Sequence, residues 1–145
     1  MSPTDQAQYF QTHWQILRYS DVLLMFAEAE NEINGPTPAA FNAINMVRRR
    51  GFGKPIGTVD PTVDLPGTLT KTAFFELLVK ERSLELGGEG IRKYDLLRWN
   101  LLATKLNETK ATLLAMSTGA APYNTLPTKM YYKASSTAED QNLFS

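Results

Sequence analysis

The sequence of 145 residues contains no cysteine, which excludes disulfide bonds, thiolate chemistry and cysteine-ligated zinc. Its single histidine, His13, has no second ligand at metal spacing, so we expect a packing role for it and no metal or cofactor. The 15 basic residues balance the 15 acidic ones, which argues against nucleic acid as a partner. No apolar run is long enough to span a membrane. The polar start, MSPTDQAQYF, lacks the features of a signal peptide, so any export signal is expected to have been removed or to lie outside these residues.

What the sequence does contain is helical periodicity in a chain whose length suits one domain. Gly35 and Pro36 are expected to end the first helix, and Thr37 is the expected N-cap of the second. The short connection predicts two antiparallel helices, the first of them central because its apolar arc is wide. The apolar stripe expected to be buried comprises Ile16, Tyr19, Leu23, Phe26, Ala27, Glu30 and Ile33 in the first helix, and Phe41, Ile44 and Val47 in the second.

The predicted fold class is all-α, with a helical hairpin over 16–50, a loop over 51–69, further packed helices over 70–116 and an irregular tail over 117–145. Thr70 is the expected cap of the third helix, and the glycines at 87 and 88 are expected to break it. The tail includes KMYYKA, a weak candidate for a short strand. The loop is apolar enough, at Ile56, Val59, Val63 and Leu65, that we expect it to pack against the domain or a partner.

Charged residues are concentrated in the stretch ERSLELGGEGIRKYDLLRW, residues 81–99. They could form a catalytic pair of carboxylates, a surface patch for a partner, or a structural ion network. Each carboxylate has a basic residue within about one helical turn, which favours the ionised form and therefore the structural reading. Covered charges of this kind must be paired, so we expect arginine–carboxylate forks to clamp the helix before the glycines to the helix after them. The predicted network comprises Glu81, Arg82, Glu85, Glu89, Arg92, Asp95 and Arg98.

A shorter basic cluster, Arg48 to Arg50, stands at the end of the second predicted helix. Cations there complement the helix dipole, and that is the role we expect for it.

Two stretches together resemble the SusD/RagB family of nutrient-binding outer-membrane lipoproteins. The first is ILRYSDVLLMFAEAENEING followed by TPAAFNAINMVRRRG, and the second is LTKTAFFELLVKERSLELGGEGIRKYDLLRWN. Order and spacing agree across residues 16–100. The sequence departs from the family pattern at Gly88, where a larger apolar residue is usual, and at Ile91, where histidine is common.

The resemblance implies a tetratricopeptide-like helical scaffold without enzymatic activity, forming the C-terminal part of a larger protein. That protein would be lipid-anchored at the outer membrane and exposed at the cell surface. It would bind a nutrient, expected to be a glycan, and pass it to a SusC-like, TonB-dependent transporter. No matching motif carries over a ligand contact, so no ligand-binding residue is assigned. Two alternatives remain: a protein-interaction module of tetratricopeptide type without its own small ligand, and a glycosidase, which would need two opposed, unpaired carboxylates.

Overall fold

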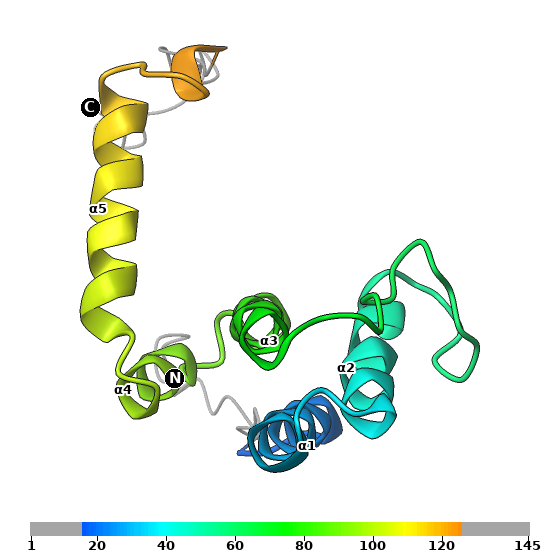
Figure 1. The fold of residues 1–145 in the computed structure, drawn as a ribbon. Coiled ribbons are helices and arrows are strands. Elements are labelled where there is room, and N and C mark those ends of the chain that lie inside the picture. The colour runs from blue at the N-terminus through cyan, green and yellow to red at the C-terminus, as the bar shows by residue number, and fades with distance from the viewer. Residues whose placement is uncertain (1–15, 126–145) are drawn as a thin grey trace, which may run out of the picture. The chain divides into compact units, whose positions relative to one another are not determined.

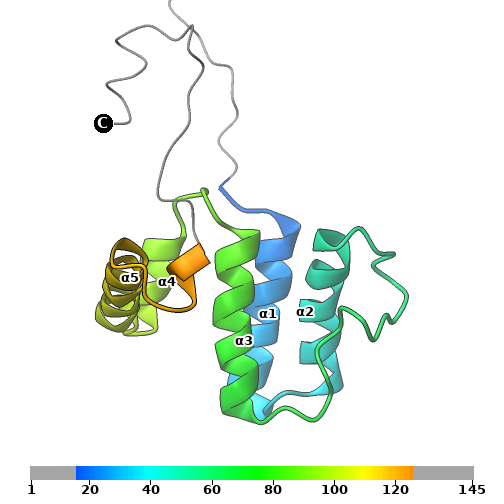
Figure 2. The ribbon, with the colours of Figure 1, turned by 90° about the horizontal axis from the view of Figure 1, so that it is seen from above.

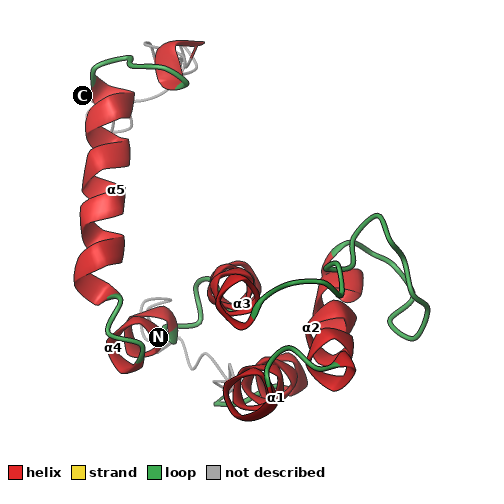
Figure 3. Cartoon of the chain, in the orientation of Figure 1, coloured by secondary structure: helices red, strands yellow, loops and turns green. Residues whose placement is uncertain are grey.

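The computed structural model describes residues 16–125, and every regular element in that range is a helix (Figures 1 and 3). The elements are α1 (Tyr19–Asn34), α2 (Pro38–Gly51), α3 (Lys71–Glu85), α4 (Arg92–Arg98), α5 (Leu102–Ser117) and the short 3₁₀ helix η2 (Tyr123–Thr125). The predicted all-α class is thereby confirmed. His13, Trp14 and the candidate strand KMYYKA lie outside the described residues.

The chain falls into two compact units, one ending at Arg92 and the other beginning at Lys93. Each is described by itself below. The prediction that residues 1–145 form one domain stays a prediction.

The first two helices form the expected hairpin. Gly35 ends α1 with φ +82°, a left-handed conformation that favours glycine. Thr37 caps α2 by accepting a hydrogen bond at Oγ1 from the backbone N–H of Ala40, at 3.3 Å, and Pro38 is the first helical residue. The two helices run antiparallel, and α1 packs against both α2 and α3 (Figure 2). These boundaries were predictable because caps are set by local chemistry.

The buried face of α1 differs from the prediction. Tyr19, Phe26 and Ile33 are 68%, 48% and 78% exposed. The structure buries a smaller and more polar set, Ser20, Asp21, Leu24, Ala27 and Asn31, of which only Ala27 belongs to the predicted stripe. The predicted stripe was wrong because a helix that is apolar nearly all round has no periodicity that selects one face.

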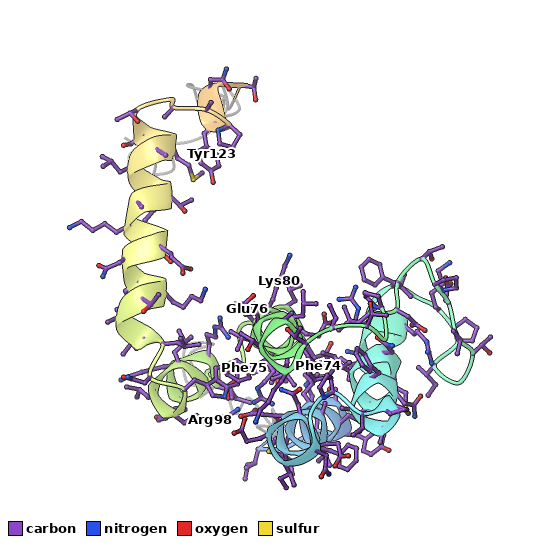
Figure 4. The ribbon with its side chains drawn as sticks, viewed as in Figure 1. Phe74, Phe75, Glu76, Lys80, Arg98 and Tyr123 are labelled. Atoms are coloured by element: carbon purple, nitrogen blue, oxygen red, sulfur yellow. The ribbon has the colours of Figure 1, made fainter. Side chains whose placement is uncertain are left out.

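The other two helices of the first unit supply most of its core. Phe41, Ile44 and Val47 of α2 are buried, as predicted. The ring of Phe41 meets that of Phe74 edge to face, with centroids 5.0 Å apart. Figure 4 shows Phe74 on the side of α3 that faces α1 and α2, with Lys80 on the opposite side. The core therefore lies where the three helices meet.

The long loop between α2 and α3 packs over only part of its length. Val63 and Leu65 are buried, and the backbone N–H of Leu65 donates to Oδ1 of Asn45 at 2.9 Å. Ile56 and Val59 are exposed. The prediction of a packed loop is therefore confirmed at Val63 and Leu65.

The helix after the loop ends where it was predicted to end. Thr70 caps α3 by accepting from the N–H of Ala73 at 3.2 Å. The helix stops at Glu85, and Gly88 and Gly90 adopt φ of +82° and +77°.

In the second unit, α5 contains no buried residue, and its leucines at 106, 113 and 114 are 60–63% exposed. Across residues 16–125, no helix is long and apolar enough to cross a membrane.

Candidate functional site

The topology gathers three helix ends at one place. In Figure 2, α2 and α3 both run opposite to α1, so the start of α1 lies at the same end of the unit as the C-termini of α2 and α3. Charged side chains from all three elements meet there. We call this the arginine–carboxylate cluster, and it consists of Arg18, Arg48, Arg50, Glu81, Glu85 and Glu89.

Arg18, immediately before α1, joins two carboxylates of the predicted network. Its Nε lies 3.0 Å from Oε1 of Glu89, and its Nη2 lies 2.7 Å from the same oxygen. Its other donors reach Oε1 and the backbone carbonyl of Glu85 and the hydroxyl of Ser20. Arginine suits this role because its planar fork can bind several acceptors at once. One side chain therefore ties the start of α1 to the end of α3 and to the turn that follows.

Electrostatics at Arg18 and Glu85 follow from this geometry. The hydrogen bond with Glu89, together with the charge of Glu85, raises the pKa of Arg18 despite burial, so the guanidinium stays charged. Burial acts to raise the pKa of Glu85, but hydrogen bonds from Arg18 and Ser20 and the charges of Arg18 and Arg50 outweigh it. The net effect is a lowered pKa, so the Glu85 carboxylate is ionised at neutral pH.

The three consecutive arginines at the end of α2 all bind acceptors. Arg48 places Nη1 2.7 Å from Oε2 of Glu81 and donates from Nε to the carbonyl of Val63 at 2.8 Å. Arg50 pairs with Glu85.

Between them, the buried Arg49 donates from Nε to Oδ1 of Asp64 at 2.7 Å, and from Nη1 to the carbonyl of Ile56 at 2.9 Å. Its hydrogen bond lowers the pKa of Asp64. A role limited to the helix dipole was therefore too narrow a reading of these arginines.

A separate ion pair lies deeper in the unit. Nη1 of Arg82 on α3 is 2.7 Å from Oδ1 of Asp21 on α1, with side chains 3% and 8% exposed. Arg92 donates from Nη1 to the backbone carbonyl of Val79 on α3 at 3.0 Å. In the second unit, Nη2 of Arg98 is 2.9 Å from Oδ1 of the buried Asp95.

The structure thus gives each predicted network residue a polar contact, but several partners differ from those expected. Glu81, Arg82 and Glu85 have ion pairs with α1, with the residue preceding it, or with α2. The contact of Arg92 with Val79 does join the start of α4 to α3, through a carbonyl oxygen. The function of the seven residues as a structural network stays a prediction.

Sequence reasoning missed the contributions of Arg18 and Asp21. Both belong to the stretch LRYSD, and both pair with residues of the second stretch, ERSLELGGEG. The signal was the presence of opposite charges in the two stretches that carry the family resemblance. Nothing local could have matched them, because the Arg18–Glu89 and Asp21–Arg82 pairs span 71 and 61 residues.

The arrangement is suited to holding helices together and poorly suited to acid–base chemistry. A general acid at neutral pH needs a carboxyl whose pKa is raised, whereas the pKa of Glu85 is lowered. Glu81 and Glu89 are each bound to an arginine as well. Within residues 16–125, no group of three or more His, Asp or Glu side chains could hold a metal ion.

Comparison with known proteins places these features in a family. The model of the SusD family matches residues 3–142. Among curated proteins, the chain is 38% identical over 109 residues to the SusD-like protein P25 of Formosa agariphila, covering 75% of this chain and 19% of that protein. It is 34% identical over 85 residues to the SusD-like protein P38 of the same organism, covering 59% of this chain and 16% of that protein.

The fold agrees with a solved structure. A crystal structure of a SusD homolog from Bacteroides thetaiotaomicron superposes with a TM-score of 0.65 at 48% identity, over 69% of this chain and 18% of that one. The matched part of this chain therefore spans less than a fifth of the length of these relatives. The family model matches nearly all of the present sequence, residues 3–142, and the chain belongs to the SusD family.

Proposed function

We propose that this chain is the helical C-terminal part of a nutrient-binding lipoprotein of the outer membrane, exposed at the cell surface, with a glycan as the expected nutrient. The observation that carries the proposal is the family match over residues 3–142. In this proposal the whole protein binds the nutrient and delivers it to a SusC-like, TonB-dependent transporter, and it catalyses no reaction.

Within that protein, the described residues act as a scaffold. Four ion pairs join α3 to α2, to α1 and to the residue that precedes α1. They are Arg18–Glu85, Arg48–Glu81, Arg50–Glu85 and Arg82–Asp21. Such contacts fix the relative placement of helices, because moving one helix would separate buried charges. A rigid scaffold is what a binding surface elsewhere in the protein requires.

The test uses the full-length polypeptide that contains this chain. Calorimetric titration against a glycan panel should give binding to at least one glycan, and detergent purification from the native membrane should recover a TonB-dependent transporter with the protein. Removing the expected lipid anchor should release it from the membrane. A full-length protein that binds no glycan and copurifies with no transporter would contradict the proposal.

The alternative is a protein-interaction module of tetratricopeptide type without its own small ligand. The observation in its favour is the exposure of large apolar side chains on α1 and α5. The same purification separates the two functions. If the full-length protein copurified with a protein partner and bound no glycan of the panel, the interaction module would be favoured.

A further inference from the structure

The turn between α1 and α2 contains the one Asn–Gly step of the sequence, Asn34–Gly35. Asn34 is the last residue of α1 and is exposed, and Gly35 follows it with φ +82°. This left-handed conformation at the end of the helix favours glycine over residues that carry a Cβ atom. The same absence of a side chain leaves the backbone nitrogen of Gly35 open to reaction with the amide of Asn34.

An Asn–Gly step can lose ammonia without a catalyst, which is one reason why asparagine is thermolabile. The backbone nitrogen of Gly35 attacks Cγ of Asn34, the Cγ–Nδ2 bond breaks, and ammonia leaves with the proton that the nitrogen gives up. The product is a succinimide ring. Water then opens the ring at either carbonyl carbon, which yields aspartate or isoaspartate at position 34. The reaction requires no oxidant, cofactor or second protein.

In the folded turn, hydrogen bonds hold both reacting groups. The backbone N–H of Gly35 donates to the carbonyl oxygen of Asn31 at 3.0 Å. The side-chain amide of Asn34 donates from Nδ2 to Oε2 of Glu30 at 3.1 Å. Because Asn34 is helical, its side chain lies back over the preceding turn, toward Glu30 and away from the nitrogen of Gly35. The reaction therefore requires the last turn of α1 to open.

Glu30 also binds the other side of the turn. Its Oε1 accepts from Oγ1 of Thr37, the N-cap of α2, at 2.9 Å. The backbone N–H of Thr37 in turn donates to the carbonyl oxygen of Gly35 at 2.8 Å. One carboxylate on α1 thus links the amide of Asn34 to the cap of the next helix, and its loss would loosen the segment in which the reaction occurs.

We propose that Asn34–Gly35 is a site of spontaneous deamidation, and that Glu30 slows the reaction by keeping the turn between α1 and α2 closed. Helix ends open more readily than helix centres, so the site reacts in locally opened molecules without unfolding of the whole unit. The inference does not depend on what the full-length protein binds.

Modification weakens the turn that restrained it. Aspartate at position 34 adds a negative charge at the C-terminal end of α1, where the helix dipole disfavours anions. The new carboxylate also lies one turn from that of Glu30, with no N–H to donate to it. Isoaspartate adds a further carbon atom to the backbone between the two helices. Either product loosens the hairpin, and neither reverts to asparagine.

Mass spectrometry of the full-length protein, incubated at mildly alkaline pH, measures the change in mass of the peptide that contains Asn34. Alkali accelerates the reaction because the attacking backbone nitrogen must be deprotonated. We expect deamidation to be detectable in the native protein, and at least about tenfold slower than in the same protein in guanidinium chloride. No product in the native protein, or a native rate within about twofold of the denatured rate, would overturn the proposal.

Two variants separate the contacts of Glu30 from its charge. Glu30→Ala removes both hydrogen bonds of the carboxylate and should raise the native rate about two- to tenfold, with no change in the rate in denaturant. Glu32→Ala removes the same charge from the same helix, at a side chain that is 74% exposed and pairs with Lys71, and should leave the native rate unchanged. Equal acceleration by the two variants would overturn the role given to Glu30.

A third variant assigns the site. Asn34→Gln keeps the amide, but its longer side chain closes a ring far more slowly, so the change in mass of this peptide should disappear. A change in mass that persisted in Asn34→Gln would place the reaction at another residue and overturn the proposal.

Discussion

Arg82 and Asp21 face each other inside the three-helix unit, with 2.7 Å between Nη1 and Oδ1 and side chains 3% and 8% exposed. Their pairing joins α3 to α1 across 61 residues of sequence. A buried ion pair adds little net stability compared with apolar groups of the same shape, but loss of one partner leaves a charge without compensation. The Arg82–Asp21 pair should therefore be detected by the loss of stability when one of the two partners is removed.

We predict that Arg82→Ala lowers the free energy of unfolding by about 2–4 kcal/mol, because Asp21 would remain buried without this partner. Chemical denaturation at neutral pH measures the change. Lys80→Ala, an exposed change on the same helix, is the control and should cost no more than about 0.5 kcal/mol. If both variants unfolded at the same denaturant concentration, the Arg82–Asp21 pair would have no structural importance.

Arg92→Ala should cost less than Arg82→Ala. Arg92 donates to the carbonyl of Val79 at 3.0 Å, so its loss removes a charge-assisted hydrogen bond without orphaning a carboxylate. We expect a loss of about 1–2 kcal/mol in the same denaturation experiment. A loss as large as that of Arg82→Ala would mean that Arg92 neutralises a buried charge.

The structural roles that could be predicted from the sequence are those determined by neighbouring residues along the chain. Thr37 and Thr70 cap helices because each side chain reaches a backbone N–H three residues on, and Gly35 ends α1 because its left-handed φ suits glycine. The helix spans and the apolar stripe of α2 follow from the same local rules.

The structural roles that could not be predicted depend on how the helices are arranged in space. Ion pairs such as Arg18–Glu89 require knowing which helix ends meet. The buried face of α1 required knowing where α2 and α3 lie, since it is the smaller and more polar face of that helix. Ile56 and Val59 looked similar to Val63 and Leu65 in sequence, but only the second pair is buried against the unit.

The lowered pKa of Glu85 predicts acid sensitivity. A carboxylate whose pKa is lower in the folded state stabilises the fold above its ordinary pKa of 4.5, and this contribution is lost as pH falls through the lowered value. Stability should therefore fall as the pH drops below about 4.5.

The Glu85→Gln variant isolates this contribution. It should be less stable at pH 7 by about 1–3 kcal/mol, a range that allows for the partly exposed Arg18 and Arg50, and should lose less stability on acidification than the unmodified chain. Asp64 has a lowered pKa as well, so part of the acid slope should remain. Glu76→Gln, at an exposed position on α3, is the control. An identical dependence of Tm on pH in the Glu85→Gln variant and the unmodified chain would contradict this account.

Docking of the loop depends on Asn45, whose Oδ1 accepts from the buried N–H of Leu65 at 2.9 Å. Asn45→Ala should cost about 1–3 kcal/mol, because that N–H would lose its acceptor. Limited proteolysis should then cut near residues 63–65 faster than in the unmodified chain. Asn42→Ala provides a matched control at an exposed position on the same helix. Equal proteolysis of the two variants would show that the loop is held by other contacts.

The last prediction concerns the 145-residue chain by itself, which should bind no glycan tightly. Sugar sites need aromatic faces held on a rigid concave surface with polar groups converging on the ligand. In the described residues, the aromatic rings of Phe41 and Phe74 are buried in the core, and the exposed rings of Tyr19, Phe26, Phe52 and Tyr94 are spread over α1, the end of α2 and α4. The arginines and carboxylates of the cluster are occupied by one another.

Calorimetric titration of starch and comparable oligosaccharides into the chain should therefore give no measurable heat of binding, while the full-length protein binds its own nutrient. Circular dichroism on the same sample checks that the chain is helical. Micromolar binding by the chain, abolished by Trp14→Ala or Tyr131→Ala, would place the glycan site within these 145 residues, in segments outside the described part of the structure. Binding abolished by Tyr19→Ala would place it on the exposed face of α1.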